Sequence, residues 1–215
     1  MFNWARAGLT LLVVLASIAA TNLDKMQQLA LTRYGSDVAR LVGEWRAMLP
    51  VPGGLKELEK LERINNFFNH RIRWADDQTV WQQEDYWATL LETLSKGAGD
   101  CEDFAIAKYA SLLISGIPES RMRLTYVRLQ QQPGAPAVAH MILAYYPDPS
   151  AEPLILDNFV AEIRTASKRP DLVPVYAFNA TNLWIPGASA VGTDPTARIS
   201  KWRDVLARLQ AEFTL

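Results

Sequence analysis

Cysteine and histidine are scarce in this chain of 215 residues, which contains Cys101 as its one cysteine and His70 and His140 as its two histidines. One cysteine excludes an internal disulfide and any multi-cysteine zinc or iron–sulfur site. Two histidines argue against a histidine-rich metal centre. Any chemistry that needs a thiol or an imidazole must therefore use one of these three side chains.

A charge excess of either sign is also missing, because 22 Lys and Arg stand against 23 Asp and Glu, for a formal net charge of -1. Proteins that bind nucleic acid through its phosphates need a basic excess, so a nucleic-acid partner is not expected. Disordered chains are poor in apolar residues, whereas 49% of these residues are hydrophobic. The length fits one medium-sized domain with a real core.

The N-terminus has the three parts of a secretory signal. Met1–Ala7 carries one positive charge, Gly8–Ala20 is almost wholly apolar, and small residues allow cleavage after Ala19 or Ala20. An uncleaved membrane anchor is the alternative, but it needs about 20 apolar residues, more than this run provides. No second run of spanning length follows. We therefore predict a cleaved signal peptide, export, and no stable membrane insertion after cleavage.

The hydrophobic period changes half-way along the chain. The first half repeats apolar residues every three or four positions, which indicates helices, and the second half alternates, which indicates strands. Helices first and an antiparallel sheet second make an α+β fold. We expect a signal peptide over residues 1–20 and a single domain over 24–215, with helices over 24–49, 55–69, 86–95, 104–114 and 199–213, and strands over 122–129, 137–146 and 153–159.

Cys101 lies beside the first turn of an apolar helix, just after a glycine-rich break. Backbone N–H groups and the helix dipole favour a thiolate there. Asp100, Glu102 and Asp103 oppose it, because nearby carboxylates raise the pKa of a thiol. A helix start rich in acids is also common for capping alone. Cys101 is therefore either a nucleophile or a small buried residue in a well-capped helix.

His140 lies inside an apolar strand, and Asp157 ends the strand that follows. If the turn is centred between Asp148 and Pro149, the two side chains face each other across the hairpin, at a Cβ separation of about 4.5–5.5 Å. A core histidine beside a strand-end aspartate is the alternative, since a slip of one residue changes the face. With Cys101 the pair would supply nucleophile, base and orienting acid. His70 has no such context.

Four blocks carry a family resemblance over about Arg71 to Trp184. Asp85–Glu92 (DYWATLLE) and Gly97–Tyr109 (GAGDCEDFAIAKY) resemble the bacterial transglutaminase-like cysteine proteases, and within them the periplasmic LapG-type enzymes. Ala139–Tyr146 and Pro153–Asn158 match the histidine and aspartate blocks of that family. The resemblance implies a papain-like, transglutaminase-like fold, in which N-terminal helices and the cysteine helix pack on an antiparallel sheet.

The resemblance also implies a calcium ion beside the nucleophile, held by Asp100, Glu102 and Asp103. Clustered carboxylates are the ligands that Ca²⁺ prefers, and a dication would offset their effect on the thiol. It further implies a periplasmic endopeptidase that cleaves the N-terminal region of a large surface adhesin and promotes biofilm dispersal. The periplasmic domain of an inner-membrane cyclic-di-GMP receptor would sequester it. A transglutaminase or amidase with the same triad, and an inactive binding module, remain alternatives.

Overall fold

The computed structural model describes residues 23–49, 55–132, 134–186 and 192–214. The predicted signal peptide, residues 1–20, lies outside this part of the chain, so its prediction stays untested. Among the helices described, none is both long and apolar enough to cross a membrane. The α-helices are α2 (Leu23–Tyr34), α3 (Ser36–Met48), α4 (Glu57–Arg71), α5 (Asp77–Trp81), α6 (Leu90–Lys96), α7 (Cys101–Ile114), α8 (Pro195–Arg198) and α9 (Ser200–Thr214).

Three helix predictions were wrong by three residues or more at a boundary. The helix predicted from residue 104 begins at Cys101. The predicted helix over 24–49 is two helices, because Gly35 between them has φ of 89°, a left-handed conformation that ends α2. The helix predicted from residue 86 begins at Leu90. Thr89 caps it, since its hydroxyl accepts from the Glu92 N–H while Glu92 accepts from the Thr89 N–H.

The strands form a seven-stranded antiparallel sheet and a separate parallel pair. The sheet has the order β6-β5-β4-β3-β7-β8-β9, and the parallel pair joins β1 to β2. Short 3₁₀ turns at Glu119–Arg121 and Ala166–Lys168 precede β3 and follow β6. The strands are β1 (Arg73–Trp74), β2 (Ala98–Gly99), β3 (Met122–Leu129), β4 (Val138–Tyr145), β5 (Leu154–Leu156), β6 (Arg164–Thr165), β7 (Leu172–Phe178), β8 (Asn182–Trp184) and β9 (Gly192–Thr193).

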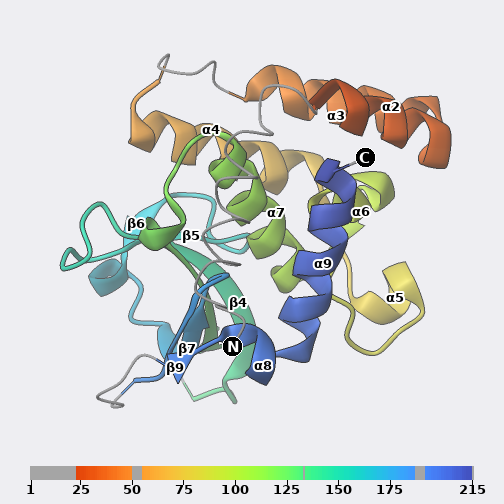
Figure 1. Ribbon diagram of the computed structural model, residues 1–215. Helices are drawn as coiled ribbons and strands as arrows, with labels where there is room; N and C mark the ends of the chain where they lie inside the picture. Colours follow the sequence, from red (N-terminus) through yellow and green to blue (C-terminus); the bar gives the residue numbers. More distant parts are fainter. Residues whose placement is uncertain (1–22, 50–54, 133, 187–191, 215) are drawn as a thin grey trace, which may run out of the picture.

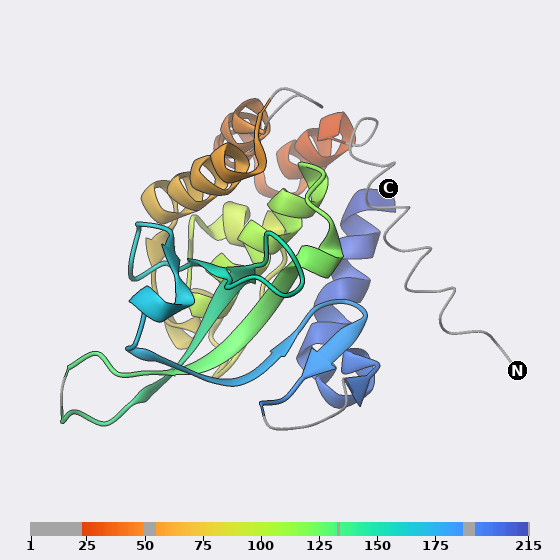
Figure 2. The same cartoon turned by 90° about the vertical axis from the view of Figure 1, so that its left-hand side faces the viewer.

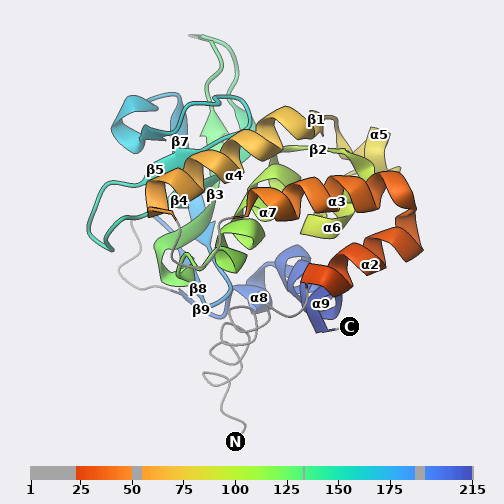
Figure 3. The same cartoon turned by 90° about the horizontal axis from the view of Figure 1, so that it is seen from above.

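Helices gather along one side of the sheet, with α7 packed directly on β4 and β3 (Figure 1). Seen from above, α4 and α6 flank α7, and α3 lies over α6 (Figure 3). Leu143 and Phe178 belong to the core between helices and sheet, whereas Ile142 and Ile155 form a small cluster on the outer face. Figure 2 shows this twisted sheet from its side. The predicted α+β fold, with the helix that starts at Cys101 packed on an antiparallel sheet, is confirmed.

Candidate active site

The turn before α7 places Cys101 at the first position of that helix. Gly97 ends α6 in a left-handed conformation, with φ of 58°. The next two residues form β2, which pairs in parallel with β1 and fixes the direction of the chain. Asp100 is the N-cap residue and Cys101 follows it, partly exposed. The predicted placement of the thiol at the start of an apolar helix is therefore correct.

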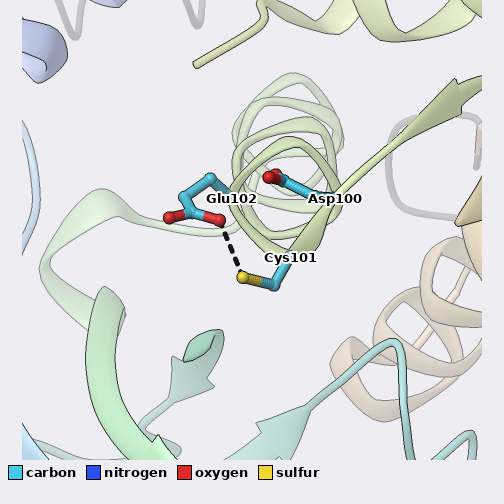
Figure 4. Close-up of side chains that lie close together, drawn as sticks. All are labelled: Asp100, Cys101 and Glu102. Atoms are coloured by element: carbon cyan, nitrogen blue, oxygen red, sulfur yellow. Dashed lines mark hydrogen bonds between the residues drawn. The ribbon is translucent and has the colours of Figure 1, made fainter. Parts of the chain in front are cut away.

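The thiol of Cys101 lies among groups that keep it protonated. Its sulfur donates a hydrogen bond to Glu102 Oε2 over 2.7 Å (Figure 4). Burial raises the pKa of the thiol well above its usual range, and the carboxylates of Glu102 and Asp100 raise it further. The Met141 backbone N–H opposes them by bonding to the sulfur. The groups named here add no positive charge beside the sulfur, so its raised pKa favours the protonated thiol.

His140 and Asp157 make the predicted contact, with 2.8 Å between His140 Nε2 and Asp157 Oδ1. Both side chains are almost fully buried, at 1% and 0% exposure. Burial would raise the pKa of Asp157, but hydrogen bonds from His140, the Phe159 N–H and Arg169 lower it to about 2. Because an ionised Asp157 can only accept, Nε2 carries the proton and Nδ1 is left as the basic nitrogen.

The predicted register of this hairpin was wrong by two residues. A pairing of His140 with Asp157 would put Leu143 opposite Leu154, whereas the structure pairs Leu143 with Leu156. The strand β5 also ends at Leu156, so Asp157 follows it. A shift of two residues leaves every side chain on its predicted face, because side chains alternate with a period of two. The contact therefore survives the error.

Arg169 is a site residue that the sequence did not reveal. Its Nη2 donates to Asp157 Oδ2 over 2.8 Å and to Asp171 Oδ2 over 2.7 Å, and its side chain is 3% exposed. The guanidinium thus holds the second oxygen of the carboxylate whose first oxygen accepts from His140. Arg169 follows Asp157 by 12 positions in a turn without regular periodicity, so no local pattern marked it.

Cys101 and His140 line the same cleft, which has a volume of about 410 Å³. Within the described chain no hydrogen bond joins the sulfur to the imidazole, since the thiol donates to Glu102 instead. Met141, whose N–H bonds to the sulfur, is the residue after His140 on β4. The nucleophile and base candidates therefore face one space. Six acidic residues share its walls: Asp76, Asp77, Glu84, Asp85, Asp100 and Glu102.

Three aspartates, of which Asp77 and Asp103 are buried and Asp100 is partly exposed, gather beside the cysteine. One carboxylate oxygen each from Asp77, Asp100 and Asp103 lies within 4.8 Å of the others. Asp77 Oδ2 accepts from the Tyr86 N–H and Asp103 Oδ1 from the Ala88 N–H, over 2.6 and 2.7 Å. Asp77 Oδ1, Asp100 Oδ1 and Asp103 Oδ2 are buried with no partner among the described residues. Three orphaned carboxylate oxygens are a donor set that suits Ca²⁺.

The electrostatics of this cluster also suit a cation. Burial and neighbouring carboxylates raise the pKa of Asp100 to about 9, and burial raises that of Asp103 to about 7. The pKa of Asp77 is raised by burial as well. Gly99 makes room for the cluster, because a Cβ at this position would overlap the Asp103 carboxylate. The residues present therefore fit a calcium ion.

The structure distributes the three predicted calcium ligands over two overlapping groups. Asp100 and Asp103 lie with Asp77, and Asp100 also lies with Cys101 and Glu102. Glu102 bonds to the thiol. Sequence reasoning missed Asp77, which comes from α5, in a segment expected to be irregular. Its one visible signal is the pair Asp76-Asp77, of which Asp76 caps α5.

Comparison with known proteins decides the family. Residues 47–181 match the family model of the bacterial transglutaminase-like cysteine proteinases. The chain belongs to this family. Its structure is similar to LapG of Legionella pneumophila, with a TM-score of 0.74 and 35% identity over 87% of this chain and 97% of that one. A comparison with curated proteins gave no match.

Two further solved structures of Legionella pneumophila LapG bear on the metal. One is calcium-bound, with a TM-score of 0.73 and 36% identity over 87% of this chain and 98% of that one. The other was treated with EGTA and gives a TM-score of 0.75 at 36% identity, over 87% and 97% of the two chains. Calcium binding is thus a property of a similar member of this proteinase family.

Proposed function

We propose that this chain is a calcium-dependent periplasmic cysteine endopeptidase that uses Cys101, His140 and Asp157 as its catalytic triad. The observation that carries the proposal is the bond from His140 Nε2 to Asp157, because it occupies one ring nitrogen of a histidine that lines the same cleft as Cys101. An imidazole held by one nitrogen and open at the other has the arrangement of a general base. Membership of the cysteine proteinase family supports the reaction class.

In the proposed reaction, His140 Nδ1 takes the proton of the Cys101 thiol as the sulfur attacks the peptide carbonyl. The C–N bond breaks, and the same proton passes to the leaving amine. Water, deprotonated by His140, then hydrolyses the thioester and releases the acid and the free thiol. The N–H of Cys101, at the start of α7, is one donor for the oxyanion. Asp157 and Arg169 hold the imidazole in place throughout.

Asp77, Asp100 and Asp103 would hold the calcium ion, with Glu102 as the fourth carboxylate next to the thiol. When bound, the ion supplies positive charge beside Cys101, which counters the carboxylates that raise the pKa of the thiol. This arrangement accounts for a dependence of activity on calcium.

The proposed substrate is the N-terminal region of a large surface adhesin, whose cleavage would release the adhesin and promote biofilm dispersal. The proposed regulator is the periplasmic domain of an inner-membrane cyclic-di-GMP receptor, which would sequester the protease. Both proposals rest on the resemblance to LapG-type enzymes, and the 35% identity to Legionella pneumophila LapG supports them. The signal-like N-terminus supports the periplasmic location.

The test is to incubate the purified mature protein with an N-terminal adhesin fragment, in calcium and in EGTA. We expect two fragments in calcium, none in EGTA, and none with Cys101→Ala in either. Asp100→Ala and Glu102→Ala should lose the calcium response. Cleavage by Cys101→Ala, or equal cleavage in EGTA, would contradict the proposal.

The same experiment separates the two alternatives. With an added primary amine, cross-linked or amine-tagged product in place of fragments would indicate a transglutaminase or amidase. Iodoacetamide labelling of Cys101 tests the inactive module. Labelling that is fast near neutral pH and sensitive to calcium supports catalysis, whereas the slow reaction of an ordinary thiol indicates a binding module.

A further inference from the structure

A second cavity lies on the outer face of the sheet, opposite α7. Its volume is about 270 Å³, and its floor is apolar, formed by Val127, Ile142, Ala144 and Ile155 on three neighbouring strands. These residues alternate with the ones that pack under α7, so their side chains point away from the helices. The cavity shares no lining residue with the proposed catalytic cleft, although His140, which pairs with Val127, lies on the same face of the sheet farther along β4.

Arg123 is a positively charged residue in the wall of this cavity. Its guanidinium stacks between two aromatic rings, 4.0 Å from the centroid of Tyr146 and 4.2 Å from that of Trp184. Stacking fixes the plane of the guanidinium and leaves its edge available for hydrogen bonds. No ion pair or hydrogen bond of the Arg123 guanidinium occurs among the described residues, and none of those that line the cavity is acidic. A preorganised cation without a counterion fits a carboxylate.

The cavity's volume limits the apolar part of the ligand. It lies just under the ~300 Å³ at which pockets for drug-sized ligands begin, so it suits one amino-acid side chain better than a long acyl chain. An apolar side chain would cover Ile142 and Ile155 while a carboxylate on the adjoining carbon reached Arg123. The C-terminal residue of a peptide carries these two groups together.

Arg169 connects this cavity to the proposed catalytic residues. It lines the cavity, and it also donates to Asp157 Oδ2 over 2.8 Å. The other oxygen of Asp157 accepts from His140. One buried side chain thus separates a ligand in the cavity from the carboxylate that orients the imidazole. A ligand that contacts Arg169 changes the environment of the pair formed by His140 and Asp157.

We propose that the outer cavity binds the C-terminal residue of a peptide that ends in an apolar side chain, with its carboxylate on Arg123, and that binding is coupled to His140 through Arg169 and Asp157. Peptide hydrolysis creates a new C-terminal carboxylate in every turnover, and in this respect the inference rests on the proposed function. Binding itself requires no turnover, so it can succeed or fail independently of proteolysis.

The first experiment measures binding to the full mature chain by calorimetry. N-acetyl-leucine, which mimics a peptide C-terminus, is expected to bind saturably. N-acetyl-leucinamide lacks the carboxylate, so its binding shows whether the carboxylate is required. Octanoate shows whether a fatty acid binds in place of a peptide C-terminus. Equal binding of acid and amide, no saturable binding of the acid, or tighter binding of octanoate would each overturn the proposal.

Matched variants locate the site. Arg123→Gln should weaken the binding of N-acetyl-leucine by about tenfold or more, since a charge-assisted hydrogen-bond pair is lost. Arg128→Gln is the control, because Arg128 lies on the same strand but is exposed and does not line the cavity. If Arg123→Gln fails to fold, Ala166→Leu fills the cavity and keeps the charge. Unchanged binding in the filled variant would contradict the site.

NMR signals of the two histidine rings measure the coupling between ligand binding in the outer cavity and His140. No substrate is present in this experiment. Saturating N-acetyl-leucine should shift the ring signals of His140 and leave those of His70 in place, because His70 is exposed on α4 and bonds to the Asn66 carbonyl. In Arg123→Gln the His140 signals should not move at the same ligand concentration. A bound ligand without a change at His140 would overturn the coupling.

Discussion

The two oxygens of Asp157 are held from opposite sides, one by His140 and the Phe159 N–H and the other by Arg169. A carboxylate bonded in this way cannot rotate without breaking several hydrogen bonds. Its pKa of about 2 means that it stays ionised near neutral pH. The orientation of His140 is therefore independent of pH near neutrality, as far as Asp157 sets it.

The first prediction concerns that carboxylate. Asp157→Asn should lower kcat/KM by about 10⁴-fold, because an amide in this place favours the wrong tautomer of the imidazole. Steady-state cleavage of an adhesin fragment measures the effect. Asp171→Asn is the control, since Asp171 bonds to Arg169 but does not contact His140. Equal losses in the two variants would show that Asp157 acts through Arg169 alone.

A second prediction concerns Gly99. Gly99→Ala should weaken calcium binding by about 10–100-fold, the usual cost of disturbing the support of a metal ligand. The added methyl would meet the buried Asp103 carboxylate, which has no open space to enter. Calorimetric titration with calcium measures the loss. Gly43→Ala on α3 is the control, because its methyl would meet the flexible end of Gln27. Unchanged affinity in Gly99→Ala would argue against Asp103 as a ligand.

At the scale of single residues, the sequence predicted those site residues that a local sequence pattern marks. Cys101 was marked by the acids around it, and His140 and Asp157 by their places in two alternating strands. Asp77 and Arg169 left no such mark, because Asp77 lies in the five-residue helix α5 and Arg169 follows a short 3₁₀ turn, and such short segments show no periodicity. Their roles depend on where the fold brings those segments, and periodicity does not report that.

Among the elements, α7 is buried along almost its whole length. It carries one buried amine, Lys108, in the hydrophobic core. Lys108 is 1% exposed, and its Nζ has no hydrogen-bond partner among the described residues. Burial lowers its pKa to about 7, although Asp157 raises it somewhat. An amine in this position lowers the stability of the helix that presents Cys101.

The third prediction follows from Lys108. Lys108→Met should raise the free energy of unfolding at pH 7 by about 1–3 kcal/mol, the cost of an unsatisfied buried polar group. Between the folded pKa of about 7 and the ordinary value of 10.5, the unfolded chain binds more protons at this site, so wild-type stability rises with pH. The charge-dependent part of the advantage of methionine is therefore largest below about pH 7 and disappears above pH 10.5, where only the cost of the unpaired neutral amine remains.

Urea unfolding over this pH range measures the difference, with Lys25→Met as the control. Lys25 is exposed on α2, so its replacement should not change the pH dependence. A destabilised Lys108→Met variant would show that the amine has a favourable partner, such as Asp157, when it is charged.

Helices and strands were predicted best where a single sequence pattern covered the whole segment. The strand Met122–Leu129 was predicted with its observed ends, because a strict alternation runs between a turn and a glutamine-rich loop. The helix break at Gly35 was missed, since an apolar stripe continues across it and hides the left-handed glycine. The shift in the β4–β5 hairpin came from the proline-rich turn, whose geometry the sequence did not specify.

For the whole molecule, the candidate calcium site joins parts of the chain that are far apart in sequence. Asp77 comes from α5, and Asp100 and Asp103 lie at the start of α7. A ligand that binds only the folded chain stabilises it by about 2.7 kcal/mol at 100 times its dissociation constant. Calcium should therefore support the fold as well as the chemistry.

The fourth prediction is that such calcium concentrations raise the melting temperature by about 5–10 °C, and that EGTA reverses the rise. Differential scanning calorimetry measures it. Asp77→Asn should remove most of the shift, whereas Asp37→Asn, on the exposed surface of α3, should keep it. A full shift in Asp77→Asn would exclude Asp77 from the ligand set.

The two-residue pair of β1 and β2 has a consequence for the metal-free protein. The Arg73 and Ala75 amides bond to the Gly97 and Gly99 carbonyls over 2.9 Å each, and these two bonds join the stretches beside the aspartates. Without calcium, mutual repulsion among Asp77, Asp100 and Asp103 destabilises the short β1–β2 pair. In the calcium-free protein, the Arg73 and Ala75 amides should then be among the first to exchange with deuterium. Their exchange would report the loss of calcium early.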